Sequence, residues 1–240
     1  MRIKKDCWLI SKPIAHRGLW GGDIIENSIT AYKNACDKGY PIEIDVYITT
    51  DNKIVSFHDS NLKRMTGVDA LITDKTLAEL KELSLLNSNE KIPTLNEILS
   101  VCENKSPLLI EIKNQKNGYA CVKEVVNLLK NYKGEFAIQS FNPFFIKKVK
   151  ELAPDFIRGI LGTNQKESKK WTENFAVKYM PFNFTIKPDF ISYNYSALPL
   201  KKRKVKNKAV LAWTVTDQTA YDSVKPYANN IIFEHFIPKK

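Results

Sequence analysis

The chain has 240 residues, of which 43% are hydrophobic, and lysine plus arginine exceed the acidic residues by 11. This length fits one large domain with a sizeable core. No apolar run reaches the ~18–20 residues that a transmembrane helix needs, and the basic N-terminus lacks the apolar region of a secretory signal. We therefore expect no integral membrane segment and a cytoplasmic location, with a mature chain that has lost its signal as the alternative.

The positive charge is mostly lysine spread along the whole chain, with a local concentration at residues 200–208 (LKKRKVKNK). This segment is typical of a polyanion-binding patch or of a solvated outer helix, and we favour the helix. The four cysteines form no C-x-x-C pair, which favours reduced thiols. We expect no nucleic-acid partner, and the sequence does not indicate an oligomeric state.

Short apolar strands alternate with amphipathic helices along most of the chain. The apolar runs predict strands at residues 13–16, 42–48, 54–58, 108–112, 136–140, 156–161, 190–193, 209–215 and 231–233. Helical spacing and end signals predict helices at residues 28–38, 76–83, 94–103, 119–131, 144–152, 165–175, 199–206 and 219–226. The alternation breaks between residues 59 and 106, which we interpret as a small insertion after the third strand.

Alternating strands and helices predict a parallel sheet with helices outside it. The number of candidate strands slightly exceeds eight, so we predict an α/β fold, a TIM (β/α)8 barrel, as a single domain over residues 1–240. A doubly wound open sheet is the alternative, but its G-x-G-x-x-G turn is absent. In a TIM barrel the catalytic groups lie at the carboxyl ends of the strands.

Two of the predicted strands carry acidic residues. In IEIDV, Glu43 and Asp45 share one face of the strand because side chains alternate, and in LLIEIK, Glu111 and Lys113 do the same. Three inward carboxylates repel one another and are costly to bury without a cation. Their oxygens suit Mg²⁺ or Ca²⁺, so we predict a divalent metal site. The alternative is that the carboxylates pair with lysines in a polar layer of the barrel.

Two of the three histidines, His16 and His58, end predicted strands that would flank the same barrel mouth. One imidazole can accept a proton while the other donates one, as hydrolysis of an ester with a poor leaving group requires. Arg17 offers a planar fork for two phosphate oxygens. Gln139 and Trp213 also fall at strand ends and are candidates for substrate contact. The alternative is that both histidines pack in the core.

These motifs occur in an order that resembles the glycerophosphodiester phosphodiesterase family. The similar segments span Ile14 to about Phe233 and are IAHRG, ENS, IEIDV-x₂-T-x-D, V-x-x-HD-x-x-L-x-R-x-T-G, LLIEIK, QSF and AWTV-x-D. The chain departs from the family where Ile25 replaces a proline and where the last strand ends in Phe233-Glu234-His235. None of these departures removes a candidate catalytic group.

The resemblance implies a TIM barrel with an insertion after the third strand, in agreement with the break at residues 59–106. It implies an enzyme that hydrolyses a small glycerophosphodiester to glycerol 3-phosphate and an alcohol. By this resemblance, His16 and His58 are the acid–base pair, and Arg17 and Lys113 lie at the substrate phosphate. The divalent metal is bound by Glu43, Asp45 and Glu111. Glu26 supports the first loop or the metal region. Two alternatives remain: a lysophospholipid or phosphoinositide-type phosphodiesterase, and a non-catalytic polyanion-binding barrel.

Overall fold

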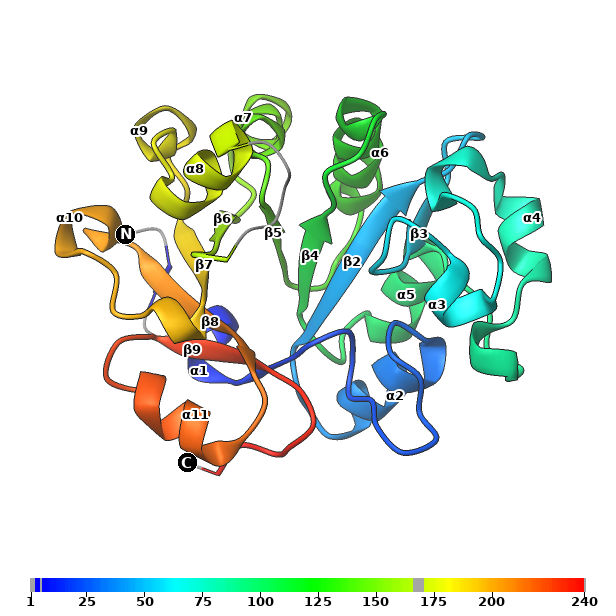
Figure 1. Ribbon diagram of the computed structural model, residues 1–240, viewed down its shortest axis with the longest axis horizontal. Helices are drawn as coiled ribbons and strands as arrows, with labels where there is room; N and C mark the ends of the chain where they lie inside the picture. The colour runs from blue at the N-terminus through cyan, green and yellow to red at the C-terminus, as the bar shows by residue number, and fades with distance from the viewer. Residues whose placement is uncertain (1–2, 5, 166–170, 240) are drawn as a thin grey trace.

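The computed structural model describes residues 3–4, 6–165 and 171–239. Within these ranges eight parallel strands form a barrel (Figure 1), namely β1 (Ile14–Ala15), β2 (Ile42–Ile48), β4 (Leu108–Ile112), β5 (Phe136–Ser140), β6 (Arg158–Gly162), β7 (Phe190–Asn194), β8 (Ala209–Val215) and β9 (Asn230–Phe233). Neighbouring strands follow the order β1-β9-β8-β7-β6-β5-β4-β2, and β1 also pairs with β2. The last pairing closes the sheet, so the predicted TIM barrel is confirmed.

The strand β3 (Ile54–Ser56) does not belong to the barrel. It pairs antiparallel with β2, and Ser56 lies opposite Val46. The prediction that residues 54–58 form a strand of the parallel barrel was therefore wrong. A three-residue apolar run is the same in a hairpin as in a barrel, so the local pattern cannot distinguish them. The hairpin explains why the sequence predicts more than eight strands.

Helices cover the outside of the barrel between successive strands (Figure 1), namely α2 (Ile29–Asp37), α5 (Leu95–Cys102), α6 (Gly118–Lys130), α7 (Pro143–Leu152), α8 (Trp171–Tyr179), α9 (Asn183–Ile186), α10 (Lys202–Val205) and α11 (Gln218–Val224). Their starts follow from the sequence: Thr94 and Glu97, for example, form the expected capping box of α5. Two helices differ from the prediction. The helix expected at 165–175 continues to Tyr179, with its predicted residues 166–170 outside the described ranges, and the one expected at 199–206 spans only α10.

The insertion between β3 and β4 begins with α3 (Lys63–Thr66) and α4 (Leu77–Glu82), and Figure 1 shows both helices beside β2 and β3 at one side of the barrel. It has its own apolar core, which includes Phe57, Leu62 and Leu80. The side chain of Arg64, on α3, reaches back to residues at the end of the hairpin. The insertion therefore borders the barrel mouth.

The amino end of the barrel is closed by α1 (Trp8–Ser11), which the sequence analysis did not predict. Trp8 and Leu9 are buried against side chains inside the barrel, among them Phe190 and Leu211. A larger core lies between the strands and the outer helices. The barrel is therefore packed at the amino ends of its strands, which leaves the carboxyl ends for a site. In the described ranges, we find no helix with the length and apolarity to cross a bilayer.

Candidate active site

A cavity of about 920 Å³ opens at the carboxyl ends of the barrel strands. Eight of the nine predicted site residues line it, namely His16, Arg17, Glu43, His58, Glu111, Lys113, Gln139 and Trp213. The ninth, Asp45, is completely buried beside them and contacts Arg17 and Lys113. The fold therefore brings together every residue that the sequence analysis selected.

Three carboxylates form the floor of this cavity. Glu43, Asp45 and Glu111 are buried, and each offers an oxygen within 4.8 Å of the others. The register of the sheet causes this grouping, because Asp45 on β2 lies directly opposite Glu111 on β4. Burial, and then the charges of Asp45 and Glu111, raise the pKa of Glu43 well above its usual value. The three carboxyl groups thus lie close together in a buried position, where each raises the cost of ionising its neighbours.

Two cations partly offset this charge. The Lys113 ammonium lies 3.1 Å from an Asp45 oxygen and 2.9 Å from a Glu111 oxygen. Burial alone would raise the pKa of Asp45, but Lys113, His58 and Arg17 lower it overall. The Arg17 backbone N–H donates to Glu43 at 3.1 Å. The neighbouring cations therefore lower the pKa of Asp45, whereas burial and the adjacent carboxylates raise that of Glu43.

The loop after β1 places Arg17 by an unusual backbone conformation. Arg17 has a φ of 57° and Gly18 a φ of 85°, both in the left-handed region. A Cβ atom at Gly18 would lie 2.8 Å from the Cβ atom of Ala31, so only glycine fits against α2. This turn directs the Arg17 guanidinium to Glu26, with 2.9 Å between Nη1 and Oε1. Glu26 supports the first loop, as the resemblance implies.

His16 is held by a carboxylate from the other end of the chain. Its Nδ1 atom lies 2.7 Å from Oε2 of Glu234, which follows β9, and its Nε2 atom lies 3.9 Å from Oε2 of Glu43. Burial alone would raise the pKa of Glu234, but the hydrogen bond to His16 and its charge lower it. The ring is thereby fixed, with Nε2 turned toward the acidic floor. This is the arrangement of a histidine oriented for proton transfer.

His58 is held in a similar way from the insertion side. Its Nδ1 atom lies 2.7 Å from Oδ1 of Asp59, and Asp59 accepts from Nε of Arg64 at 2.6 Å. Arg64 also donates to Glu26 at 2.6 Å, so one chain of polar contacts joins Arg17 to His58. Burial lowers the pKa of His58 to about 4, with Asp45 acting in the opposite sense. His58 is therefore neutral near pH 7 and able to accept a proton.

The opposite side of the cavity is aromatic. Phe141, Phe144, Phe182 and Trp213 line it, and the rings of Phe141 and Trp213 meet edge to face at 5.6 Å between centroids. The indole N–H of Trp213 is buried without a hydrogen-bond partner in the described structure. Gln139, by contrast, accepts a hydrogen bond from Ser192 at 2.7 Å and is almost fully buried. Trp213 thus has a free donor, whereas Gln139 already has a partner inside the barrel.

The acidic floor fits a divalent cation. Its donors are three carboxylates of the kind that Mg²⁺ and Ca²⁺ prefer, and they already converge without an ion. The residues that would hold the ion are Glu43, Asp45 and Glu111.

The sequence analysis missed three residues of the site. It placed Glu234 only in an unusual strand end, and it did not assign roles to Asp59 or Arg64 beyond their positions in a motif. The signal for Asp59 was its place directly after a candidate histidine. No local signal could identify Glu234, because its partner lies 218 residues away in the sequence.

Comparison with known proteins was consistent with this site. The model of the glycerophosphoryl diester phosphodiesterase family matches residues 16–237. A glycerophosphodiester phosphodiesterase from Caldanaerobacter subterraneus is 35% identical to this chain. The matched region covers 62% of this chain and 65% of that relative's length. The Bacillus subtilis protein YhdW is 30% identical, over 85% of this chain and 86% of its own length.

Solved structures show the same architecture. An Oleispira antarctica phosphodiesterase, described in complex with the product sn-glycerol-3-phosphate, superposes with a TM-score of 0.78 at 26% identity and covers 94% of this chain and 93% of its own. A glycerophosphodiester phosphodiesterase from Parabacteroides distasonis gives 0.75 at 26% identity, with 92% of each chain covered. With the family model matching nearly the whole length of the barrel, the chain belongs to the glycerophosphoryl diester phosphodiesterase family.

Proposed function

We propose that this protein hydrolyses glycerophosphodiesters to glycerol 3-phosphate and an alcohol, in a reaction that depends on a divalent cation. The observation that carries the proposal is the pair of carboxylate-anchored histidines facing one cavity whose floor is an acidic triad. The product named for the Oleispira antarctica relative supports the same substrate class. Glu43, Asp45 and Glu111 would hold this cation, Mg²⁺ or Ca²⁺, which when bound would supply positive charge beside the phosphate oxygens.

The two histidines move the protons. We assign to His58, which is neutral near pH 7, the role of accepting the proton of the nucleophile, either water or a hydroxyl of the glycerol. His16 then gives the leaving alcohol its proton, and Glu234 stabilises the charged imidazole before that transfer. The bond between phosphorus and the alcohol oxygen breaks as the bond to the nucleophile forms. Attack by water gives glycerol 3-phosphate directly, whereas attack by the glycerol hydroxyl gives a cyclic glycerol phosphate that water then opens to the same product. Each ring is held at Nδ1, so Nε2 of each is the atom that exchanges the proton.

The phosphate is held by Arg17 and Lys113. The Arg17 Nε atom is buried without a hydrogen-bond partner in the described structure, so the guanidinium has unused donor capacity at the cavity. Lys113 is buried between two carboxylates, so its ammonium is fixed in position. We infer that Arg17 contacts the substrate phosphate directly and that Lys113 balances the charge beside it.

A second substrate class, the lysophospholipids, is favoured by the aromatic side of the cavity. Phe144, Phe182 and Trp213 provide an apolar surface on which an acyl chain could lie. A human relative named lysophospholipase D, 34% identical over 52% of this chain, supports this candidate, although this chain spans only 43% of that protein's length. Comparing kcat/KM on glycerophosphocholine and on lysophosphatidylcholine separates the two substrate classes.

The decisive experiment measures release of glycerol 3-phosphate from glycerophosphocholine with Mg²⁺ or Ca²⁺ present. We expect turnover in the native chain, loss of it in excess chelator, and recovery when the cation is restored. His16→Ala and His58→Ala should each abolish most activity, whereas His235→Ala, at a half-exposed histidine that does not line the cavity, should not. Full activity in chelator, or in either active-site variant, would refute the proposal and leave a polyanion-binding barrel as the better explanation.

A further inference from the structure

The helix α8 carries an aromatic stripe on its outer face. Trp171, Phe175 and Tyr179 follow one another at four-residue spacing, which places them on the same side of the helix. Their rings contact each other, with centroid distances of 6.5 Å between the first two and 4.7 Å between the last two. Such spacing usually marks the buried face, yet Trp171 is 75% exposed and the other two are about half exposed.

The segment that follows α8 and continues through α9 packs on the barrel by other residues. Met180 and Ile186 are buried against Ile160 and Ile191 of the strands β6 and β7. Phe184, on α9, points away from this contact and is 87% exposed. The exposed aromatic side chains are therefore not the ones that hold this segment on the barrel.

A second cavity, of about 590 Å³, lies between α8, α9 and α10. Tyr179 and Phe184 line it, so the aromatic stripe continues to its edge. The rest of its lining is strongly basic and includes Lys187, Arg203, Lys204, Lys206 and Lys208. Its lining contains no carboxylate among the described residues.

The basic groups crowd one another. The pKa of Lys204 is lowered, first by burial and then by the charges of Arg203, Lys201 and Lys178. Its ammonium lies 5.2 Å from the centre of the Tyr179 ring, and that of Lys178 lies 5.5 Å from the same ring. An anion that entered this cavity would relieve the repulsion and replace water around several cations at once.

This basic and aromatic surface adjoins the mouth of the active site. Phe182 lines the catalytic cavity, and Phe184, two residues later, lines the basic cavity. Ala176 and Val177 of α8 also line the catalytic cavity, while the outer stripe of the same helix faces away. Figure 1 shows α8, α9 and α10 together on the side of the barrel opposite the α3–α4 insertion.

We propose that this surface docks the protein on an anionic lipid bilayer, with lipid phosphate groups at the basic cavity and the rings of Trp171, Phe175 and Phe184 in the interfacial layer. Aromatic residues with lysine and arginine beside them are the composition that binds such an interface. The occupant is a lipid surface rather than nucleic acid because Phe184 projects an apolar ring beside the cations, and because the surface borders a cavity with an apolar wall. Docking would orient that cavity toward the bilayer.

The test is sedimentation of the full chain with vesicles of phosphatidylcholine, with and without phosphatidylglycerol. We expect binding only to the anionic vesicles, weakening as salt is raised. The double variant Arg203→Ser/Lys206→Ser should lose about 25-fold in affinity, at about fivefold for each charge near the surface. Phe184→Ala should lose about tenfold, because partial burial of a phenyl ring contributes about half of its full transfer free energy.

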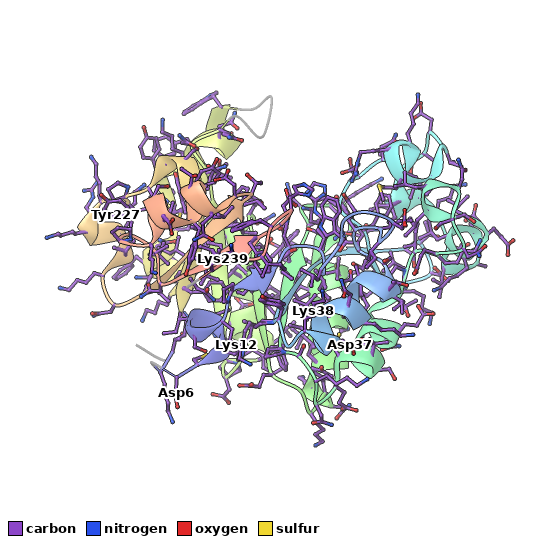
Figure 2. All side chains as sticks on the ribbon, turned by 90° about the horizontal axis from the view of Figure 1, so that it is seen from below. Asp6, Lys12, Asp37, Lys38, Tyr227 and Lys239 are labelled. Carbon is purple, nitrogen blue, oxygen red and sulfur yellow. The ribbon has the colours of Figure 1, made fainter. Side chains whose placement is uncertain are left out.

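Matched controls lie on other elements of the molecule. Figure 2 shows Lys12 in the N-terminal segment, Lys38 at the end of α2 and Tyr227 after α11. Lys12→Ser/Lys38→Ser removes the same charge, and Tyr227→Ala removes a ring that is 51% exposed. Both should retain vesicle affinity within about twofold, and all variants should keep native turnover of glycerophosphocholine, a measurement that tests the catalytic proposal separately.

Three outcomes would overturn the proposal. One is an absence of binding to anionic vesicles at low salt, and another is an equal loss in the control pair, which would indicate net charge alone. The third is tighter binding of a single-stranded oligonucleotide through Arg203 and Phe184 that vesicles do not displace, which would identify a nucleic-acid surface.

Discussion

Replacement of Glu234 tests whether a residue directly after the last strand controls the activity of His16, which directly follows the first strand. The Glu234 carboxylate contacts Nδ1 of His16 at 2.7 Å, and both side chains are largely buried, at 16% and 14% exposure. A hydrogen bond with an ionised partner in such a position contributes about 1.5–3 kcal/mol. If Glu234→Ala removes this whole stabilisation from the transition state, in which His16 is charged, kcat/KM falls by about 10- to 150-fold.

Glu234→Gln refines the test, because the amide oxygen still accepts a hydrogen bond but carries no charge. A neutral bond has roughly half the strength of a charged one, so the expected loss is about 4- to 12-fold. Both variants should reduce kcat more than they raise KM, since Glu234 does not line the cavity in which substrate would bind. The assay is release of glycerol 3-phosphate from glycerophosphocholine at saturating cation.

Two further measurements make the result interpretable. Thermal unfolding shows whether the variants remain folded, and Glu151→Gln, at an exposed carboxylate of α7 paired with Lys148, controls for loss of a surface charge. Activity of Glu234→Ala within twofold of the native chain would refute the reasoning, because His16 would then need no fixed partner.

Three other predictions follow from the same site. Mg²⁺ at about 100 times its Kd should raise the Tm of the native chain by about 5–10 °C in calorimetry, and Glu43→Gln should abolish that rise. Arg64→Met should lower kcat about three- to tenfold, because Asp59 loses a charged hydrogen bond. Arg64→Lys should show the same loss, because one ammonium cannot reach Asp59 and Glu26 together. Unchanged kcat in either variant would refute this role for Arg64. The pKa of His58 is lowered on folding, so its contribution to stability is present above its unfolded value of about 6.5 and is lost as pH falls toward about 4. Urea titrations at several pH values over that interval should therefore show a smaller fall in unfolding free energy for His58→Gln than for the native chain. An identical dependence of unfolding free energy on pH in the two proteins would contradict the assignment.

The acidic floor was largely predictable because the alternation of side chains along each strand points to it. Alternation places Glu43 and Asp45 on one face of β2, and three buried carboxylates are costly unless positive charge offsets them. The insertion was predictable for a different reason, since residues 59–106 break a regular alternation. In both cases the information is contained in a short segment.

The errors have the opposite cause. The strand at residues 54–58 has the composition of a barrel strand, and only its pairing with β2 shows that it is a hairpin. The contact of Glu234 with His16 exists only after the barrel has closed. The outward aromatic stripe of α8 was also unpredictable, because Trp171 and Phe175 have the spacing of a core face. Such features depend on which neighbours the fold supplies, and no local pattern contains that information.

The pairing of β1 with β9 has a consequence for biosynthesis. A nascent chain that has emerged through β8 already contains both candidate histidines, all three carboxylates and Arg17. Its barrel is nevertheless open, because β1 still lacks the partner strand that supplies Phe233 and then Glu234. Closure joins segments separated by more than two hundred residues, which is a slow step in folding. Catalytic competence should therefore appear late and abruptly, when the final strand leaves the ribosome, instead of growing with chain length.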